Sequence, residues 1–107
     1  MRIRVYAGKR MLGPGKMELL GHLARLGSLT AAARKMSMSY MRAWTLVKDL
    51  NSDSSRPMVA LSRGGTAGGA ARVTPFGRKV LALYERMEKE SRKVAAPYGR
   101  KLARLIT

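Results

Sequence analysis

Two tight breaks divide the first half of this 107-residue chain into three short stretches of helical character. They lie at residues 27–28 and 37–38, where glycine and serine interrupt the apolar pattern. The spacing of the apolar residues predicts helices over 16–26, 29–36 and 40–51. Helices this short are stable only when they pack on one another, so the pattern predicts one small helical cluster with a single core.

Serine hydroxyls at the breaks are candidate caps for the second and third helices. Ser28 and Ser39 each precede one of these helices, where a side-chain oxygen accepts a hydrogen bond from a free backbone amide. In the third helix Ala43, Val47 and Leu50 recur at i, i+4 and i+7 and form its predicted buried face. The opposite face is rich in hydrogen-bond donors and poor in carboxylates; it carries Tyr40, Met41, Arg42, Thr45 and Lys48.

Short β patterns flank the helical cluster. Residues 2–6 alternate basic and apolar side chains, but so short a strand needs a partner, so we expect it to pair with another sheet or with another subunit. The glycine-rich stretch 8–15 is typical of a connector. After a polar loop over 51–57, residues 58–61 and 72–73 are predicted to form a hairpin around a basic, glycine-rich tip.

The last part of the chain carries the strongest single helix-start signal. Thr74 is a candidate N-cap and Pro75 suits the first helical position, so we expect a helix over about 75–94. Pro97 is expected to end or kink that helix, because proline lacks an amide hydrogen and clashes with the preceding turn. A short amphipathic tail helix over 96–107 follows.

The charge balance points to a polyanionic partner. The chain has 22 Lys and Arg against 6 Asp and Glu, a formal net charge of +16, and three long windows contain no acid: 1–17, 19–48 and 54–84. Cations in these windows have no carboxylate for i,i+4 pairing, so they face solvent or a phosphate partner. A field of this size implies a nucleic acid or a membrane surface.

Several classes of protein are excluded by what the sequence lacks. It has no Cys, which removes disulfides, thiolate zinc sites and cysteine nucleophiles. No run of 18 apolar residues and no signal-peptide pattern occur, so we expect a cytoplasmic protein without a membrane partner. His22 has no second imidazole and no carboxylate cluster, and the scattered acids offer no catalytic set, so neither a metal, a cofactor nor an enzyme is expected.

This order of elements is that of a winged helix-turn-helix. We expect a mainly α fold with a small β wing, a short N-terminal strand and a long C-terminal helix, organised as one domain over 1–95 with the tail over 96–107. In such a fold the first two helices hold the third so that its N-terminal turns enter a major groove about 12 Å wide. The basic hairpin then reaches the DNA backbone alongside.

Five segments of the chain carry distinctive motifs. They are Gly13-Pro14-Gly15, Gly27-Ser28-Leu29-Thr30-Ala31-Ala32-Ala33, Met38-Ser39-Tyr40-Met41-Arg42-Ala43-Trp44, Arg63-Gly64-Gly65 and Ala71-Arg72-Val73-Thr74-Pro75-Phe76-Gly77-Arg78. Together they resemble the N-terminal DNA-binding domain of the ModE family of molybdate-responsive transcriptional regulators. The resemblance covers about 13–90, and its Gly-Ser-x-Thr-x-Ala-Ala part is also similar to LysR-type regulators.

The resemblance implies a homodimer that binds a near-palindromic operator, with the N-terminal strand and the helix after the wing contributing to pairing. Family members sense molybdate in C-terminal domains, and this chain ends at Thr107, so we expect no molybdate binding by it. The predicted function is sequence-specific binding of double-stranded DNA as a homodimeric transcription regulator. The alternatives are a nonspecific nucleoid- or RNA-associated protein and a heterodimer partner of a full-length molybdate-sensing regulator.

Individual residues are assigned to DNA contact. Arg42 is expected to contact a guanine edge or a phosphate, and Arg63 and Arg72, which flank the wing tip, to contact phosphates. Tyr40 either contacts DNA or packs over the preceding turn, whereas Trp44 is expected to belong to the scaffold. The predicted DNA-binding residues are Ser39, Tyr40, Met41, Arg42, Thr45, Lys48, Arg63 and Arg72.

Overall fold

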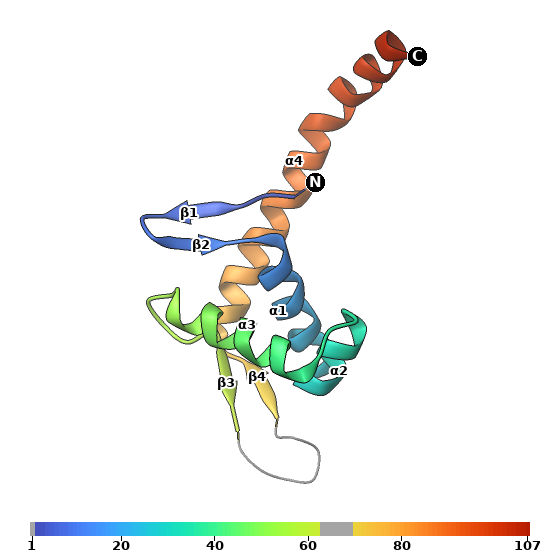
Figure 1. The fold of residues 1–107 in the computed structure, drawn as a ribbon. Helices are drawn as coiled ribbons and strands as arrows, with labels where there is room; N and C mark the ends of the chain where they lie inside the picture. Colours follow the sequence, from blue (N-terminus) through green and yellow to red (C-terminus); the bar gives the residue numbers. More distant parts are fainter. Residues whose placement is uncertain (1, 63–69) are drawn as a thin grey trace.

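The computed structural model describes residues 2–62 and 70–107, and in these ranges eight helices and strands follow one another (Figure 1). Their order confirms the predicted winged helix-turn-helix with its short N-terminal strand and long last helix. In chain order they are β1 (Val5–Ala7), β2 (Arg10–Leu12), α1 (Pro14–Leu26), α2 (Leu29–Lys35), α3 (Tyr40–Ser52), β3 (Val59–Leu61), β4 (Ala71–Val73) and α4 (Pro75–Ile106).

The core lies where the first three helices meet the β3–β4 hairpin and the start of α4. Ala43, Val47 and Leu50 are the buried residues of α3, as the i, i+4, i+7 pattern predicts. Burial of one large aliphatic side chain contributes about 1.5–3 kcal/mol, so this cluster dominates the stability of the domain. Its largest fully buried side chains are Leu19, Leu20, Leu23, Leu29, Val47, Leu50 and Val59.

The predicted caps of the helical cluster are confirmed. Gly27, after α1, has φ +66°, the left-handed conformation that ends many helices. The Ser28 hydroxyl accepts a hydrogen bond from the amide of Ala31 at 3.2 Å and starts α2. The Ser39 hydroxyl accepts one from the amide of Arg42 at 3.1 Å and starts α3. These local bonds fix where each helix begins.

The turn between α2 and α3 is a Schellman motif with Ser37 at its left-handed position. The amide of Met38 donates to the carbonyl of Ala33 at 3.0 Å, and the amide of Ser37 donates to that of Arg34 at 3.1 Å. Ser37 has φ +54°, and among the described residues it is the one non-glycine with a positive φ. The tight break predicted at 37–38 therefore exists, but a serine occupies a conformation that favours glycine.

The N-terminal strand pairs within its own chain, which corrects the expectation that it needs another sheet or subunit. β1 pairs antiparallel with β2, with Val5 opposite Leu12. The two-residue turn between them begins at Gly8, whose φ is +62°, and glycine at this position is typical of a type II′ hairpin turn. Residues 10–12 are thus a strand where the sequence pattern predicts a connector.

The wing hairpin leads directly into α4. Val59 pairs with Val73 in the antiparallel β3–β4 ladder. The Thr74 hydroxyl accepts a hydrogen bond from the amide of Gly77 at 3.0 Å and donates one to the carbonyl of Pro57 at 2.8 Å. The predicted cap at Thr74 is therefore confirmed, and it also ties the start of α4 to the loop before β3.

Helix α4 runs without interruption through Pro97, so the predicted end near residue 94 and the separate tail helix are wrong. Proline's fixed φ is compatible with a helix. Ala95 and Ala96 before it, and the run of Arg, Lys, Leu and Ala over 100–105, are strong helix formers that offset the one hydrogen bond it removes. The last buried residue of α4 is Tyr84, and beyond it the helix projects from the body (Figure 1). The radius of gyration is therefore 16.3 Å, against about 13 Å for a compact domain of this length.

None of the helices in residues 2–62 and 70–107 has the length and apolar character needed to cross a bilayer.

Candidate nucleic-acid interface

The outer face of α3 collects most of the predicted DNA-binding side chains. All of those that the structure describes are exposed, and α3 lies beside the β3–β4 hairpin at one end of the molecule (Figure 1). Arg63 lies outside the described residues. The exposed members of the predicted set are Ser39, Tyr40, Met41, Arg42, Thr45, Lys48 and Arg72.

Arg42 occupies the first turn of α3, the part of a recognition helix that enters deepest into a groove. Its backbone amide is held by Ser39. Its exposed guanidinium forms no ion pair or hydrogen bond with any described part of the chain. Five N–H donors in a fixed planar fork are therefore available to an external acceptor, which suits a guanine edge or a phosphate.

Met41 and Thr45 present mainly apolar groups on the same face. The Thr45 hydroxyl donates to the carbonyl of Met41 at 3.0 Å, so its hydrogen is committed within the helix. The Thr45 methyl group and the Met41 side chain, which is 65% exposed, remain on the surface. Such groups suit contact with the methyl group of thymine rather than donation to a base.

Trp44 and Lys48 form a pair one turn apart on α3. The indole packs against the hydrophobic core, in agreement with the predicted scaffold role. Its ring also faces the Lys48 ammonium, which lies 4.5 Å from the ring centroid. This distance is typical of a cation–π contact.

The wing supplies a further cation beside α3. Arg72 lies opposite Ala60 in the β3–β4 ladder and is exposed. Leu61, the last residue of β3, is 42% exposed next to it. Because β3 packs against α3, a surface that contacts the helix also meets this edge of the wing.

Two long-range interactions that local sequence patterns cannot reveal hold the far end of α3. The side chain of Asn51 forms three hydrogen bonds with the backbone at the start of β3. Its Oδ1 accepts from the amides of Met58 and Val59 at 2.9 and 3.1 Å, and its Nδ2 donates to the Val59 carbonyl at 2.9 Å. Lys16 of α1 forms a part-buried ion pair with Asp53 at 3.1 Å. The sequence pattern places Asn51 where the third helix ends and the polar loop begins, and assigns it no role; in the structure it lies in α3 and ties this helix to the wing.

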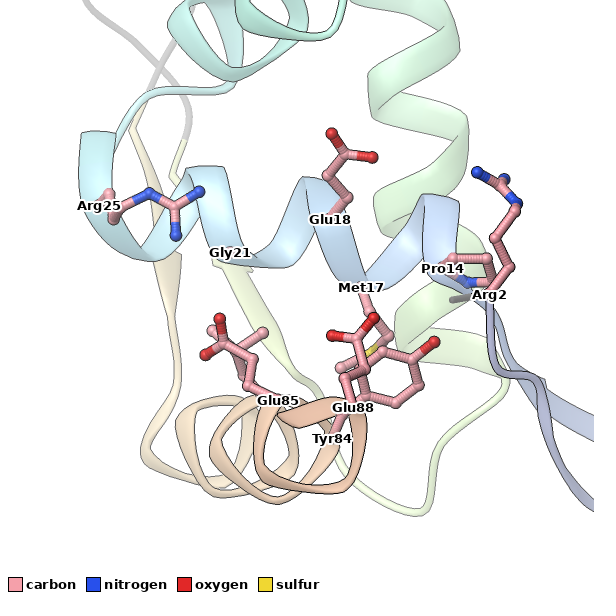
Figure 2. Close-up of a pocket in the computed structure, with 10 residues that line it drawn as sticks. Arg2, Pro14, Met17, Glu18, Gly21, Arg25, Tyr84, Glu85 and Glu88 are labelled. Atoms are coloured by element: carbon pink, nitrogen blue, oxygen red, sulfur yellow. The ribbon is translucent and has the colours of Figure 1, made fainter. Parts of the chain in front are cut away.

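Three of the six carboxylates of the chain lie away from α3, around a hollow of about 360 Å³ between α1 and α4. Figure 2 shows Glu85 and Glu88 pointing from α4 toward α1, with Glu18 on α1 itself and Arg2 and Arg25 at the two ends. Phosphate is repelled from such a surface. Half of the carboxylates of the chain therefore lie away from the outer face of α3.

Tyr84 forms the floor of this hollow and anchors the N-terminal segment. Its hydroxyl donates a hydrogen bond to the carbonyl of Ile3. Burial, together with the nearby Glu88 carboxylate, raises the pKa of the Tyr84 phenol above its ordinary value of 10.0. The phenol is therefore a stable donor at neutral pH.

Metal ligands are not gathered anywhere in residues 2–62 and 70–107. The ring of His22 contacts Arg25 at 3.0 Å through Nδ1 and lies 3.8 Å from Glu18 through Nε2. Both ring nitrogens thus face neighbours on α1, which agrees with a surface histidine on a helix face.

More than half of the chain matches a known protein family. Residues 15–78 match the family described as "Bacterial regulatory helix-turn-helix protein, lysR family". This range begins within α1 and ends in the first turn of α4, so it includes α3 and the wing.

Curated relatives carry names from molybdenum biology. The chain is 38% identical over 95 residues to the molybdenum-pterin-binding protein MopB of Rhodobacter capsulatus, covering 89% of this chain and 35% of that protein. It is 32% identical over 77 residues to the DNA-binding transcriptional dual regulator ModE of Escherichia coli K12, covering 72% and 29%. These relatives confirm the resemblance to ModE regulators. The chain spans about a third of the length of the curated relatives it matches.

Solved structures show the same fold at low sequence identity. The full-length LTTR LysG of Corynebacterium glutamicum superposes with a TM-score of 0.66 at 20% identity, covering 87% of this chain and 30% of that one. A MarR family protein from Bacillus stearothermophilus superposes with a TM-score of 0.59 at 17% identity, covering 88% and 72%.

Proposed function

Because this chain belongs to the bacterial regulatory helix-turn-helix proteins of the lysR family, we propose that it binds double-stranded DNA sequence-specifically as a homodimeric, cytoplasmic transcription regulator. The observation that carries the proposal is the exposed first turn of α3, where the Arg42 guanidinium has no partner in the described chain. A buried or paired arginine at this position would have no fork to offer a base.

In the proposed complex α3 reads base edges and the wing binds the backbone. The N-terminal turns of α3 enter the major groove, where Arg42 contacts a guanine and the Met41 and Thr45 methyl groups meet apolar base edges. Arg72 and, as the sequence predicts, Arg63 contact phosphates beside the groove. Of the N-terminal cations, Lys9 and Arg10 belong to the β1–β2 hairpin, which lies apart from the wing (Figure 1), and Arg2 lines the hollow between α1 and α4.

The proposed dimer forms through the projecting part of α4. Val94, Tyr98 and Leu105 are 65% to 81% exposed and recur at spacings of four and seven, so they share one face of the helix. An apolar face of this kind is unfavourable in water unless a second helix covers it.

The charges along α4 favour an antiparallel pair. Its acids lie between residues 85 and 90, whereas residues 94–107 carry only cations: Arg100, Lys101 and Arg104. A parallel pair would place these three cations against their copies, whereas an antiparallel pair places them beside residues 85–93 of the partner, where three acids accompany four cations. We assign residues 1–95 to the DNA-binding domain and the remainder of α4 to dimer formation.

A selection of bound duplexes from a random pool tests the proposal directly. A twofold dimer selects two related half-sites with centres about 34 Å apart, or a multiple of this distance. At matched ionic strength the selected duplex should bind on the order of 10³-fold more tightly than random DNA. Equal affinities would instead support a nonspecific nucleic-acid binder, which the net charge of +16 also permits.

A further inference from the structure

Trp44 is the single tryptophan of the chain, and its ring has both an apolar and a cationic neighbour. One part of the indole packs against the hydrophobic core. Another part is reached by the Lys48 ammonium at 4.5 Å from the ring centroid. The indole therefore links the rigid interior of the domain to an exposed cation on the outer surface of α3.

Without such a contact a lysine on a helix has no fixed position. Its ammonium sits on a flexible four-carbon stem and binds as a point charge rather than as a planar fork. Lys48 forms no ion pair with a carboxylate in the described chain, although Asp49 is its neighbour in sequence. Among the described contacts, the Trp44 ring is what restrains the ammonium.

Lys48 lies on a different side of α3 from Arg42. Six residues of helix advance by about 9 Å and rotate by about 240°, so the two cations diverge by about 120°. If Arg42 points to the floor of a groove, Lys48 points to one of its walls, where the phosphates of the DNA backbone lie. Lysine suits phosphate, since a point charge needs no bidentate geometry.

We propose that Trp44 is a positioning residue that holds the Lys48 ammonium in place for a backbone phosphate of the bound duplex. The inference rests on the proposed function, because it names how one cation of that interface is held. In this proposal the indole itself contacts no base. The contact requires an aromatic face at position 44. Trp44→Phe should therefore lower the DNA affinity only slightly, whereas Trp44→Leu should lower it more.

A double-mutant cycle on the selected duplex tests the coupling. Lys48→Gln removes one phosphate contact and should lower the slope of log K against log[salt] by about 0.9. Trp44→Leu should weaken binding about two- to five-fold, as expected for loss of an exposed cation–π contact. In the Trp44→Leu/Lys48→Gln double variant the loss should be no greater than in Lys48→Gln alone, and Trp44→Phe should restore most of the affinity.

Arg72→Gln is the matched control, because Arg72 is an exposed cation of the wing with no aromatic contact described. Its effect should add fully to that of Trp44→Leu. Fully additive effects of Trp44→Leu and Lys48→Gln, in variants whose circular dichroism matches the parent, would overturn the proposal. So would Trp44→Leu binding with the affinity and salt slope of the parent.

Fluorescence of the unaltered indole provides a second measurement that requires no change at position 44. Lys48→Gln in the free protein should change the emission of Trp44, while Arg72→Gln should leave it unchanged. No change on Lys48→Gln would overturn the contact itself, even if Trp44→Leu fails to fold. If the parent protein binds no duplex while Lys48→Gln still changes the emission, the proposed function fails and the intramolecular contact stands.

Discussion

A side-chain carbon added to Gly77 would lie 2.3 Å from the carbonyl oxygen of Met58. The same carbon would lie 2.9 Å from a methyl group of Val73. The start of α4 thus approaches the backbone before β3 so closely that only glycine fits. This contact sets how the wing joins the helical body.

Gly77→Ala should lower the free energy of unfolding by about 1–3 kcal/mol, the usual cost of overpacking, because a backbone carbonyl cannot move aside cheaply. Gly99→Ala in the same helix is the matched control, since nothing lies within 4 Å of its added carbon. There alanine should raise stability by about 0.5–1 kcal/mol through helix propensity. Urea unfolding of both variants measures these two changes in the free energy of unfolding, which should have opposite signs. Equal changes would contradict the close approach of Gly77 to the Met58 carbonyl.

Ser37→Gly should stabilise the domain by up to about 1 kcal/mol. The φ of +54° costs an L-residue roughly 1–2 kcal/mol, and the larger unfolded-state entropy of glycine offsets only part of that relief. Ser37→Val should instead destabilise by more than 1 kcal/mol, because a β-branched side chain is worse at positive φ. Thermal unfolding of the two variants provides the comparison; a Ser37→Gly protein less stable than the parent would refute the strained turn.

Tyr84→Phe should cost about 1 kcal/mol, the value of one hydrogen bond to the Ile3 carbonyl. The pKa of Tyr84 is raised in the folded state, so its contribution is fully present below pH 10.0 and is lost as the pH rises through the higher folded-state value. The difference in stability between the parent and Tyr84→Phe should therefore be constant from pH 7 to 9. Tyr6→Phe, at a side chain that is 69% exposed, should have no effect at any of these pH values.

Arg42→Ala should reduce the difference in affinity between the selected duplex and random DNA. The expected loss of binding free energy is about 1–3 kcal/mol and affects only the selected duplex. Arg72→Ala should weaken binding to both duplexes about equally and reduce the salt slope by about one. Titrations at several ionic strengths separate the two effects. An Arg42→Ala protein that keeps its sequence preference would show that α3 is not the reading helix.

The absence of Cys in the chain allows the α4 pairing to be tested by disulfide formation. In an antiparallel pair centred near residue 96, two copies of residue 101 lie about 15 Å apart along the helix axis, beyond the reach of a disulfide. Ser91→Cys and Lys101→Cys should therefore form no covalent dimer alone but a mixed disulfide when combined. Covalent dimers of Lys101→Cys alone would indicate a parallel pair, and a monomeric mass for the parent would show that the chain does not form the dimer.

The elements predicted best are those whose ends depend on neighbouring residues. Ser28, Ser39 and Thr74 bind amides three residues ahead, so their caps are visible in the sequence and agree with the structure. The break at 37–38 is equally local, since the Schellman hydrogen bonds span at most five residues. The order of these local signals was enough to predict the fold class.

The features that were missed depend on pairs distant in sequence or on a small balance of energies. The Lys16–Asp53 ion pair joins residues 37 positions apart, and the contacts of Asn51 reach seven and eight residues ahead, so neither has a local pattern. The β1–β2 hairpin depends on one glycine at Gly8, a weak signal beside the glycine-rich stretch that follows. At Pro97 the sequence predicts helix on both sides but does not show that continuing one helix through the proline outweighs its local penalty.

An unbroken α4 also makes the projecting helix a lever. It starts two residues after the wing strand ends at Val73 and extends for 32 residues, about 48 Å of continuous helix. A small rotation at the base of such a rod becomes a large displacement at its tip. A force on the tip is therefore transmitted to α1 and to the wing strand β4, the elements that the base of α4 contacts.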